Sequence, residues 1–159
     1  MLVSVAPETA AAEGIAAESL LTDVITGLGP ASGLHAALLR FEAAFLVAVD
    51  MPYAEPRLAK QLINAAAAPQ TPAEAYSAIH AGAYAPVAVA ATANGRTEPT
   101  FSLYFREMLP ELLSAIECGD YSLNRLLARV QTRYVEVSAE TLLNVNYPDD
   151  YDALIKGTK

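Results

Sequence analysis

The sequence predicts an α/β domain with a mostly parallel β-sheet that is covered by helices on both faces. Short apolar segments of strand length alternate with amphipathic segments of helical length along most of the chain. The segment Phe45–Val49 is apolar at every position, which is typical of a strand buried on both faces. The 159 residues have the length of one domain and contain no linker or internal repeat, so we expect a single domain over residues 1–159.

Local signals mark where the expected elements begin and end. Gly27-Leu28-Gly29-Pro30 separates a strand from a helix, Thr71-Pro72-Ala73-Glu74 is a capping box, and Asn94-Gly95 predicts a tight turn between two strands. Strands are expected at Leu2–Val5, Leu20–Ile25, Phe45–Val49, Pro86–Thr92, Thr100–Tyr104 and Arg133–Val137. Helices are expected at Glu8–Ser19, Ser32–Phe41, Glu55–Ala66, Thr71–His80, Arg106–Glu117 (bent at Pro110), Ser122–Val130 and Pro148–Ile155.

Composition excludes several classes of partner and site. Asp and Glu number 18 against 10 Lys and Arg, and the formal charge of −8 argues against binding to nucleic acid or to an anionic membrane. No apolar run approaches the roughly 18 to 20 residues of a membrane helix. The single cysteine, Cys118, excludes an internal disulfide. We expect a soluble, cytoplasmic domain.

Asp50 is the most informative candidate residue, because it directly follows the apolar strand. Ligands of open α/β sheets bind beyond the carboxyl ends of the strands, and Mg²⁺ prefers one or two carboxylates together with phosphate oxygens. The alternative is that Asp50 caps a helix begun by Pro52, and on spacing alone this is the more common role.

Other candidates also follow expected strands. Asp23 is either a ligand or a turn residue, and the turn from Gly27 to Gly33 either lets backbone N–H groups approach a ligand or is only a turn. Asn144 and Asn146 are two apart, so in an extended chain both amides face one side; otherwise they stabilise a turn before Pro148. His35 and His80 lack a metal-binding spacing, and we expect both on helix surfaces.

Four segments taken together resemble the molybdenum cofactor guanylyltransferases and their nucleotidyltransferase relatives. The family has a "GPLaGL" turn after an aspartate, a "DMPF" strand end, a "PxxxLY" strand and an "NvNtPeDl" segment. The corresponding segments here, in the same order, are Asp23 with Gly29-Pro30-Ala31-Ser32-Gly33-Leu34, Phe45–Tyr53, Pro99–Tyr104 and Leu143–Asp150. The resemblance covers about residues 1–155.

The resemblance implies a three-layer α/β/α Rossmann-like fold and Mg²⁺-dependent transfer of a nucleotide from GTP to molybdopterin. By position, Asp50 would hold the metal and lie beside the triphosphate. Asp23 would belong to the nucleotide site together with the turn that contains Gly29 and Gly33. Asn144 and Asn146 would face the acceptor.

The family also has an opening strand and a glycine-rich loop, "LAGGxSxRMGxDK", which has no counterpart in these 159 residues. Met1 stands where the second strand of the family would begin, and the first basic residue is Arg40. We therefore expect a domain truncated relative to the family, with its first strand and phosphate loop missing. Because positioning and charge neutralisation supply most of the catalysis of such transfers, guanylyl transfer by this chain alone is expected to be absent or very slow.

Three functional alternatives remain open at this point. The domain binds nucleotide, pterin or a protein partner without transfer; a partner chain completes an active enzyme; or the scaffold serves only as an interaction module. Loss of a central strand would leave two unpaired strand edges, so we expect a homodimer or a partner chain to cover the gap.

Overall fold

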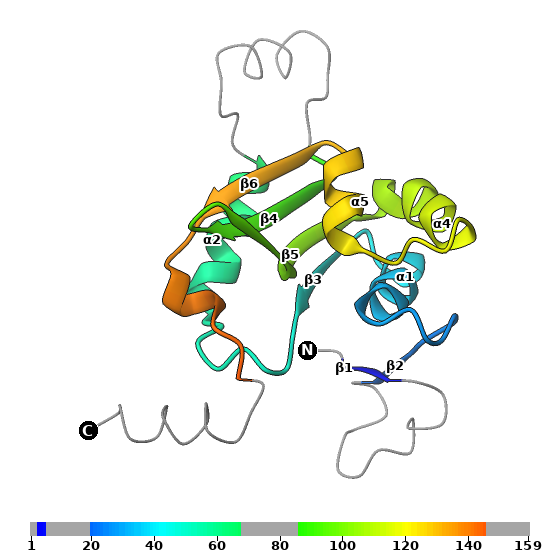
Figure 1. The fold of residues 1–159 in the computed structure, drawn as a ribbon, viewed down its shortest axis with the longest axis horizontal. Coiled ribbons are helices and arrows are strands. Elements are labelled where there is room, and N and C mark those ends of the chain that lie inside the picture. The colour runs from blue at the N-terminus through cyan, green and yellow to red at the C-terminus, as the bar shows by residue number, and fades with distance from the viewer. Residues whose placement is uncertain (1–2, 6–19, 68–85, 146–159) are drawn as a thin grey trace, which may run out of the picture.

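The structure of the protein, a computed structural model, describes residues 3–5, 20–67 and 86–145. Its strands form two sheets (Figure 1). In the smaller sheet, β1 (Val3–Val5) pairs in parallel with β2 (Leu20–Thr22). The larger sheet has the order β3-β5-β4-β6, and its strands are β3 (Ala43–Val47), β4 (Ala88–Ala93), β5 (Arg96–Phe105) and β6 (Thr132–Glu136).

Three strands of the larger sheet run in the same direction. β4 and β6 are parallel, whereas β5 is antiparallel to both of its neighbours, β3 and β4. The predicted turn at Asn94 and Gly95 produces this exception, because both residues have positive φ angles and return the chain directly beside β4. The predicted α/β fold is confirmed, with β5 as the antiparallel member of the sheet.

Helices cover the larger sheet on both faces and make three layers (Figure 1). On one face lie α1 (Pro30–Arg40), α4 (Leu109–Glu117) and α5 (Leu123–Arg129), and on the other lies α2 (Pro56–Ala67). Alternation along β4 serves both cores: Ala88 and Ala90 pack with α1, α4 and α5, while Val89 and Ala91 pack on the side of α2.

The apolar strand before Asp50 differs from its prediction. β3 spans Ala43–Val47 rather than Phe45–Val49, and its residues are exposed or half-buried instead of buried on both faces. Within the described residues β3 pairs only with β5, so it lies at an edge of the larger sheet. The strand that is buried on both faces is β4, which has a hydrogen-bonded neighbour on each side.

Several other boundaries moved by a few residues. The second strand ends at Thr22, not Ile25, and the strand expected at Thr100–Tyr104 extends from Arg96 to Phe105. The helix expected from Arg106 is a short 3₁₀ turn, Arg106–Met108, followed by α4 with Pro110 in its first turn, and a second 3₁₀ turn covers Ala139–Leu142. The helices expected at Glu8–Ser19, Thr71–His80 and Pro148–Ile155 lie outside the described residues.

Asp120 organises the link between α4 and α5. Its carboxylate accepts hydrogen bonds from Arg125 (Nη2 to Oδ1, 2.6 Å), Arg129 (Nη2 to Oδ2, 2.7 Å) and the backbone N–H of Ser122 (3.2 Å). Ser122 also caps α5, because its hydroxyl accepts the N–H of Arg125. The hydrogen bonds from Arg125 and Ser122 lower the pKa of Asp120 from 3.8 to about 2.

We predict that Arg125→Gln raises the pKa of Asp120 back toward 3.8, as measured by NMR titration of the carboxyl group. A depressed pKa contributes stability that is complete above the ordinary value of 3.8 and is lost as the pH falls through about 2. The variant should therefore lose stability relative to the unchanged protein above this window and show a smaller acid dependence within it. Arg57→Gln, which breaks an exposed ion pair with Glu55 at the start of α2, is the control and should leave the Asp120 titration unchanged. Titration of Asp120 near 3.8 in the unchanged protein would contradict the prediction.

Candidate functional site

Asp50 lies beyond the carboxyl end of β3. The sheet register continues past the end of the strand, because the N–H of Ala48 donates to the carbonyl of Thr100 on β5 at 3.0 Å. One carboxylate oxygen of Asp50, Oδ1, is buried and has no hydrogen-bond partner among the described residues. A buried carboxylate oxygen without a donor is costly, and a cation or an added donor at this position would satisfy it.

The capping alternative for Asp50 is wrong. Helix α2 begins at Pro56, six positions after Asp50, so Asp50 is not the residue that precedes its first turn. The chain between them forms a turn in which the N–H of Ala54 donates to the carbonyl of Met51 at 3.3 Å. The geometry thereby removes the structural role that spacing alone had favoured for this carboxylate.

The structure brings the asparagine segment to Asp50. The N–H of Val145 donates to the backbone carbonyl of Asp50 at 2.8 Å, although 95 positions separate them in the sequence. Asn144, the neighbour of Val145, is exposed, and Asn146 lies outside the described residues. The sequence alone carried no signal for this contact, since a backbone hydrogen bond depends on no side chain.

Asp23 and the glycine turn follow β2. Asp23 comes directly after Thr22, the last residue of β2, and is half-buried. Gly29 is exposed, with φ 60° and ψ −140°, and its carbonyl accepts the N–H of Ser32 at 3.0 Å. Gly33, the other glycine assigned to the nucleotide site, is buried within the first turns of α1, whose side chains pack in the core.

Helix α1 connects the two sheets, because it contacts both β2 and β3. In the unit β2–α1–β3, helix α1 begins after the carboxyl end of β2, and Asp50 follows the carboxyl end of β3. Ser32 stabilises the entry to the helix, since its buried hydroxyl accepts the N–H of Leu28 at 3.2 Å. This arrangement places both groups of candidate residues after strand ends, where open α/β sheets bind ligands.

His35 contradicts the expectation of a surface histidine. It lies on α1 with only 4% of its surface exposed, and its Nδ1 atom has no hydrogen-bond partner among the described residues. The side of α1 that carries His35 is therefore covered by the rest of the domain. His80 lies outside the described residues.

A metal at this site would depend on few protein ligands. Within the described ranges, no group of three or more His, Cys, Asp or Glu side chains is arranged to hold a metal ion. A Mg²⁺ ion beside a nucleotide takes one or two carboxylates from the protein and its remaining oxygens from phosphate and water. Asp50, with one unpartnered oxygen, fits that requirement.

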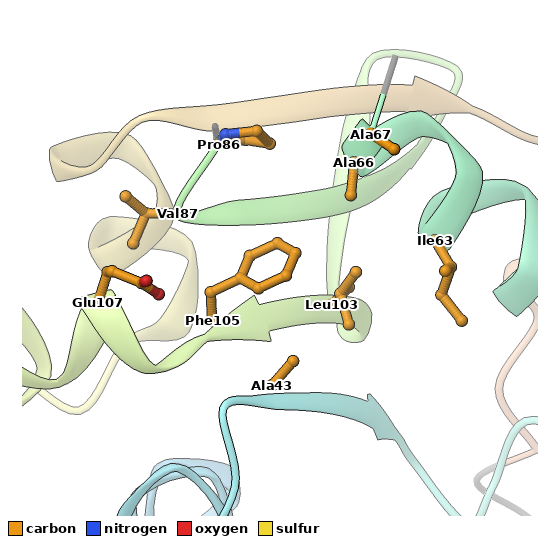
Figure 2. Close-up of a pocket in the computed structure, with 9 residues that line it drawn as sticks. All are labelled: Ala43, Ile63, Ala66, Ala67, Pro86, Val87, Leu103, Phe105 and Glu107. Atoms are coloured by element: carbon orange, nitrogen blue, oxygen red, sulfur yellow. The ribbon is translucent and has the colours of Figure 1, made fainter. Parts of the chain in front are cut away.

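A separate cavity of about 650 Å³ lies at the opposite end of the sheet. Figure 2 shows its lining, in which Glu107 is the charged member. Ala43 begins β3 and Phe105 ends the antiparallel β5, so the cavity opens at the amino ends of the parallel strands, away from Asp50. Its remaining lining residues are Ile63, Ala66, Ala67, Pro86, Val87 and Leu103. The apolar lining does not suit a triphosphate.

No helix in the described ranges is both long enough and apolar enough to cross a membrane.

Comparison with known proteins identifies relatives along most of the chain. Residues 1–137 match the family model of the MobA-like NTP transferase domain. The chain is 25% identical over 129 residues to a protein of Thermococcus sibiricus named "Probable molybdenum cofactor guanylyltransferase", covering 77% of this chain and 59% of the relative. It is 27% identical over 148 residues to a protein of the same name from Methanosarcina mazei, covering 86% of this chain. The chain spans 59% of the length of each of these relatives.

Solved structures share the fold. Molybdopterin-guanine dinucleotide biosynthesis protein A from Archaeoglobus fulgidus superposes with a TM-score of 0.67 at 24% identity, over 89% of this chain and 69% of its own. The Rv0371c protein of Mycobacterium tuberculosis superposes with a TM-score of 0.62 at 19% identity, over 98% of this chain and 75% of its own. At these identities the superpositions establish the fold.

We predict that Gly29→Ala destabilises the protein by about 1–3 kcal/mol, because the φ and ψ angles at this position are rarely adopted by a residue with a Cβ atom. No atom lies within 4 Å of the added Cβ, so the cost is conformational rather than steric. Chemical denaturation measures the difference, and Pro30→Ala at the next position is the matched control, with a loss below about 1 kcal/mol. Equal stability of Gly29→Ala and the unchanged protein would contradict the strained turn.

Proposed function

Because the chain belongs to the MobA-like NTP transferase family, we propose that it binds a Mg²⁺–GTP complex beyond the carboxyl end of β3. Its relatives are named as molybdenum cofactor guanylyltransferases, so the proposed acceptor is molybdopterin. Asp50 is the proposed metal ligand and catalytic residue. Asp23, Gly29 and Gly33 are assigned to the nucleotide, and Asn144 and Asn146 to the acceptor.

The observation that carries the proposal is the unpartnered, buried Oδ1 of Asp50. A bound Mg²⁺ would neutralise charge on the phosphates of the nucleotide. Asp50 would orient that ion, and the hydrogen bond from Val145 to the Asp50 carbonyl holds the backbone in place at 2.8 Å. Since the same bond anchors Val145, the neighbour of Asn144, the side chain of Asn144 would lie near the metal–nucleotide complex.

We further propose that these 159 residues alone transfer the nucleotide slowly or not at all. They contain no glycine-rich loop of the "LAGGxSxRMGxDK" type, and their formal charge of −8 works against a triphosphate. Backbone N–H groups of such a loop hold the phosphates and offset their charge, and positioning together with charge stabilisation supplies almost all of the catalysis in this kind of transfer. Binding without efficient transfer is therefore the expected behaviour, and addition of a partner that supplies such a loop would restore turnover.

Calorimetric titration with GTP and with CTP, each with Mg²⁺, tests this proposal. GTP should bind, and Asp50→Asn should weaken binding about thirtyfold or more, because losing one partner of a buried charged contact costs about 2–5 kcal/mol. The control is Glu117→Gln, an exposed residue at the end of α4, which should bind as the unchanged protein does. A thermal melt of each variant shows that it is folded.

Release of pyrophosphate from GTP in the presence of molybdopterin separates the alternatives. Binding with little release supports the proposal as stated. Rapid release by the chain alone would contradict the impaired transfer. Absence of binding with either nucleotide would contradict the site at Asp50 and favour an interaction module built on the same fold.

A further inference from the structure

Glu98 lies at the same end of the larger sheet as Asp50, although the two residues belong to different parts of the chain. Strand β5 runs antiparallel to β3 and β4, so its first residues lie beside the carboxyl ends of those strands. Glu98 itself pairs with Ala91 near the end of β4. In the sequence Glu98 precedes the expected strand Thr100–Tyr104, so the rule that selected Asp50 did not select it.

Hydrogen bonds within β5 hold both the side chain and the backbone of Glu98. Its Oε1 atom accepts the N–H of Thr100 at 3.1 Å and the hydroxyl of the same residue at 2.6 Å. The hydroxyl of Ser102 donates to the Glu98 carbonyl at 2.8 Å. The carbonyl of Thr100 accepts the N–H of Ala48 at 3.0 Å, on the stretch that leads from β3 to Asp50. Thr100 therefore contacts both the Glu98 carboxylate and the chain segment that positions Asp50.

Both bonds from Thr100 end on one oxygen of the Glu98 carboxylate. Since each carboxylate oxygen accepts hydrogen bonds, Oε2 is left to accept from a ligand. Glu98 is half-buried, and in the part of the chain that the structure describes no basic side chain forms an ion pair with it. Glu136 at the same end of the sheet differs, because its Oε1 accepts the N–H of Asn94 at 3.0 Å and its Oε2 accepts the hydroxyl of Thr92 at 2.7 Å.

A fixed carboxylate of this kind matches a ring that carries an N–H beside an amino group. The 2-amino-4-oxopyrimidine unit has these two donors side by side on one edge, and a hydrogen bond from such a donor to an ionised carboxylate is stronger than one between neutral groups. Guanine contains this unit, and so does the pterin ring of the proposed acceptor. Where an oxo group replaces the amino group, an acceptor faces the carboxylate and is repelled.

We propose that Glu98 is a specificity-determining residue that accepts hydrogen bonds from the 2-amino-4-oxopyrimidine unit of a bound ring, either the guanine of the nucleotide or the pterin of the acceptor. The inference rests on the proposed function, because that function brings both rings to this end of the sheet. Glu98 recognises the ring, whereas the metal is assigned to Asp50.

Calorimetric titration of the unchanged protein with two pairs of ligands tests this assignment without depending on the folding of any variant. One pair is GTP and xanthosine triphosphate, each with Mg²⁺. The other pair is 6-hydroxymethylpterin and 6-hydroxymethyllumazine, without metal. In each pair the 2-amino group of the first ligand is an oxo group in the second. The protein should bind the amino member of at least one pair about tenfold or more tightly, because a hydrogen bond to a charged group contributes about that factor.

Glu98→Gln should reverse this preference. The amide oxygen keeps the hydrogen bonds from Thr100, and the amide NH₂ group takes the place of Oε2, where it donates to an oxo group and opposes an amino group. Glu136→Gln is the matched control and should keep the preference of the unchanged protein, because hydrogen bonds from Thr92 and Asn94 already occupy the Glu136 carboxylate. A thermal melt of each variant shows that it is folded.

The two pairs separate the sources of the ring and separate this inference from the proposed function. Reversal between GTP and xanthosine triphosphate assigns Glu98 to the base, and reversal between the pterin and the lumazine assigns it to the acceptor. Equal affinity within both pairs, or a Glu98→Gln variant that keeps the amino preference, would overturn the inference even where GTP binding depends on Asp50. Pterin binding that depends on Glu98, without any binding of GTP, would overturn the nucleotide site alone. Absence of binding with all four ligands would overturn both.

Discussion

Strand β5 holds the larger sheet together, because among the described strands it is the one that hydrogen-bonds both β3 and β4. A register shift between Ala90 and Ala91 divides its pairing with β4 into two parts, and residues 102–104 pair with β3 and β4 at once. Residues 96–98 continue with β4, while Thr100 reaches Ala48 beyond the end of β3. The bulged backbone is satisfied locally, since Ser102 donates to the carbonyl of Glu98 at 2.8 Å and Tyr104 donates to that of Pro99 at 2.7 Å. Burial of the Tyr104 hydroxyl raises its pKa, so it stays a donor.

The position of Asp50 follows from this connection. β5 holds β3 in the sheet, β3 leads to Asp50, and Val145 arrives from the far end of the described chain to bond the Asp50 carbonyl. Backbone groups do all of this positioning, which leaves the carboxylate available for a ligand. An acidic protein that receives a triphosphate needs a cation between the two, and an unpartnered carboxylate oxygen is a suitable place to hold one.

Strand β3 combines a sequence suited to the centre of a sheet with a place at an edge. Its side chains contribute to both cores: Ala44 and Leu46 pack with the cluster under α1, and Phe45 packs on the side of α2, where its ring meets that of Phe101 edge to face at 5.1 Å. The backbone of β3 forms strand hydrogen bonds to β5 on one edge, and no described strand pairs with its other edge.

Local patterns in the sequence were sufficient for the type and order of most described elements. Short apolar runs predicted most of the strands, the Asn94-Gly95 pair predicted the hairpin, and the spacing of the leucines in Ser122–Val130 predicted α5. These features depend on near neighbours in the chain. The sequence also singled out Asp50 and Asn144 as candidates, through their places in motifs.

Only the tertiary structure decided which strand became central and which side chains became buried. An apolar run such as Phe45–Val49 indicates that its side chains favour burial. Whether they are buried depends on which strands lie on either side of it, and long-range pairing decides that. For the same reason His35 on α1 and Arg133 on β6 are buried although both residue types suggest a surface, with Arg133 donating to the carbonyl of Ala65 near the end of α2. The hydrogen bond between Val145 and Asp50 was also decided by the tertiary structure. It joins backbone groups 95 positions apart, and a backbone hydrogen bond requires no particular residue type.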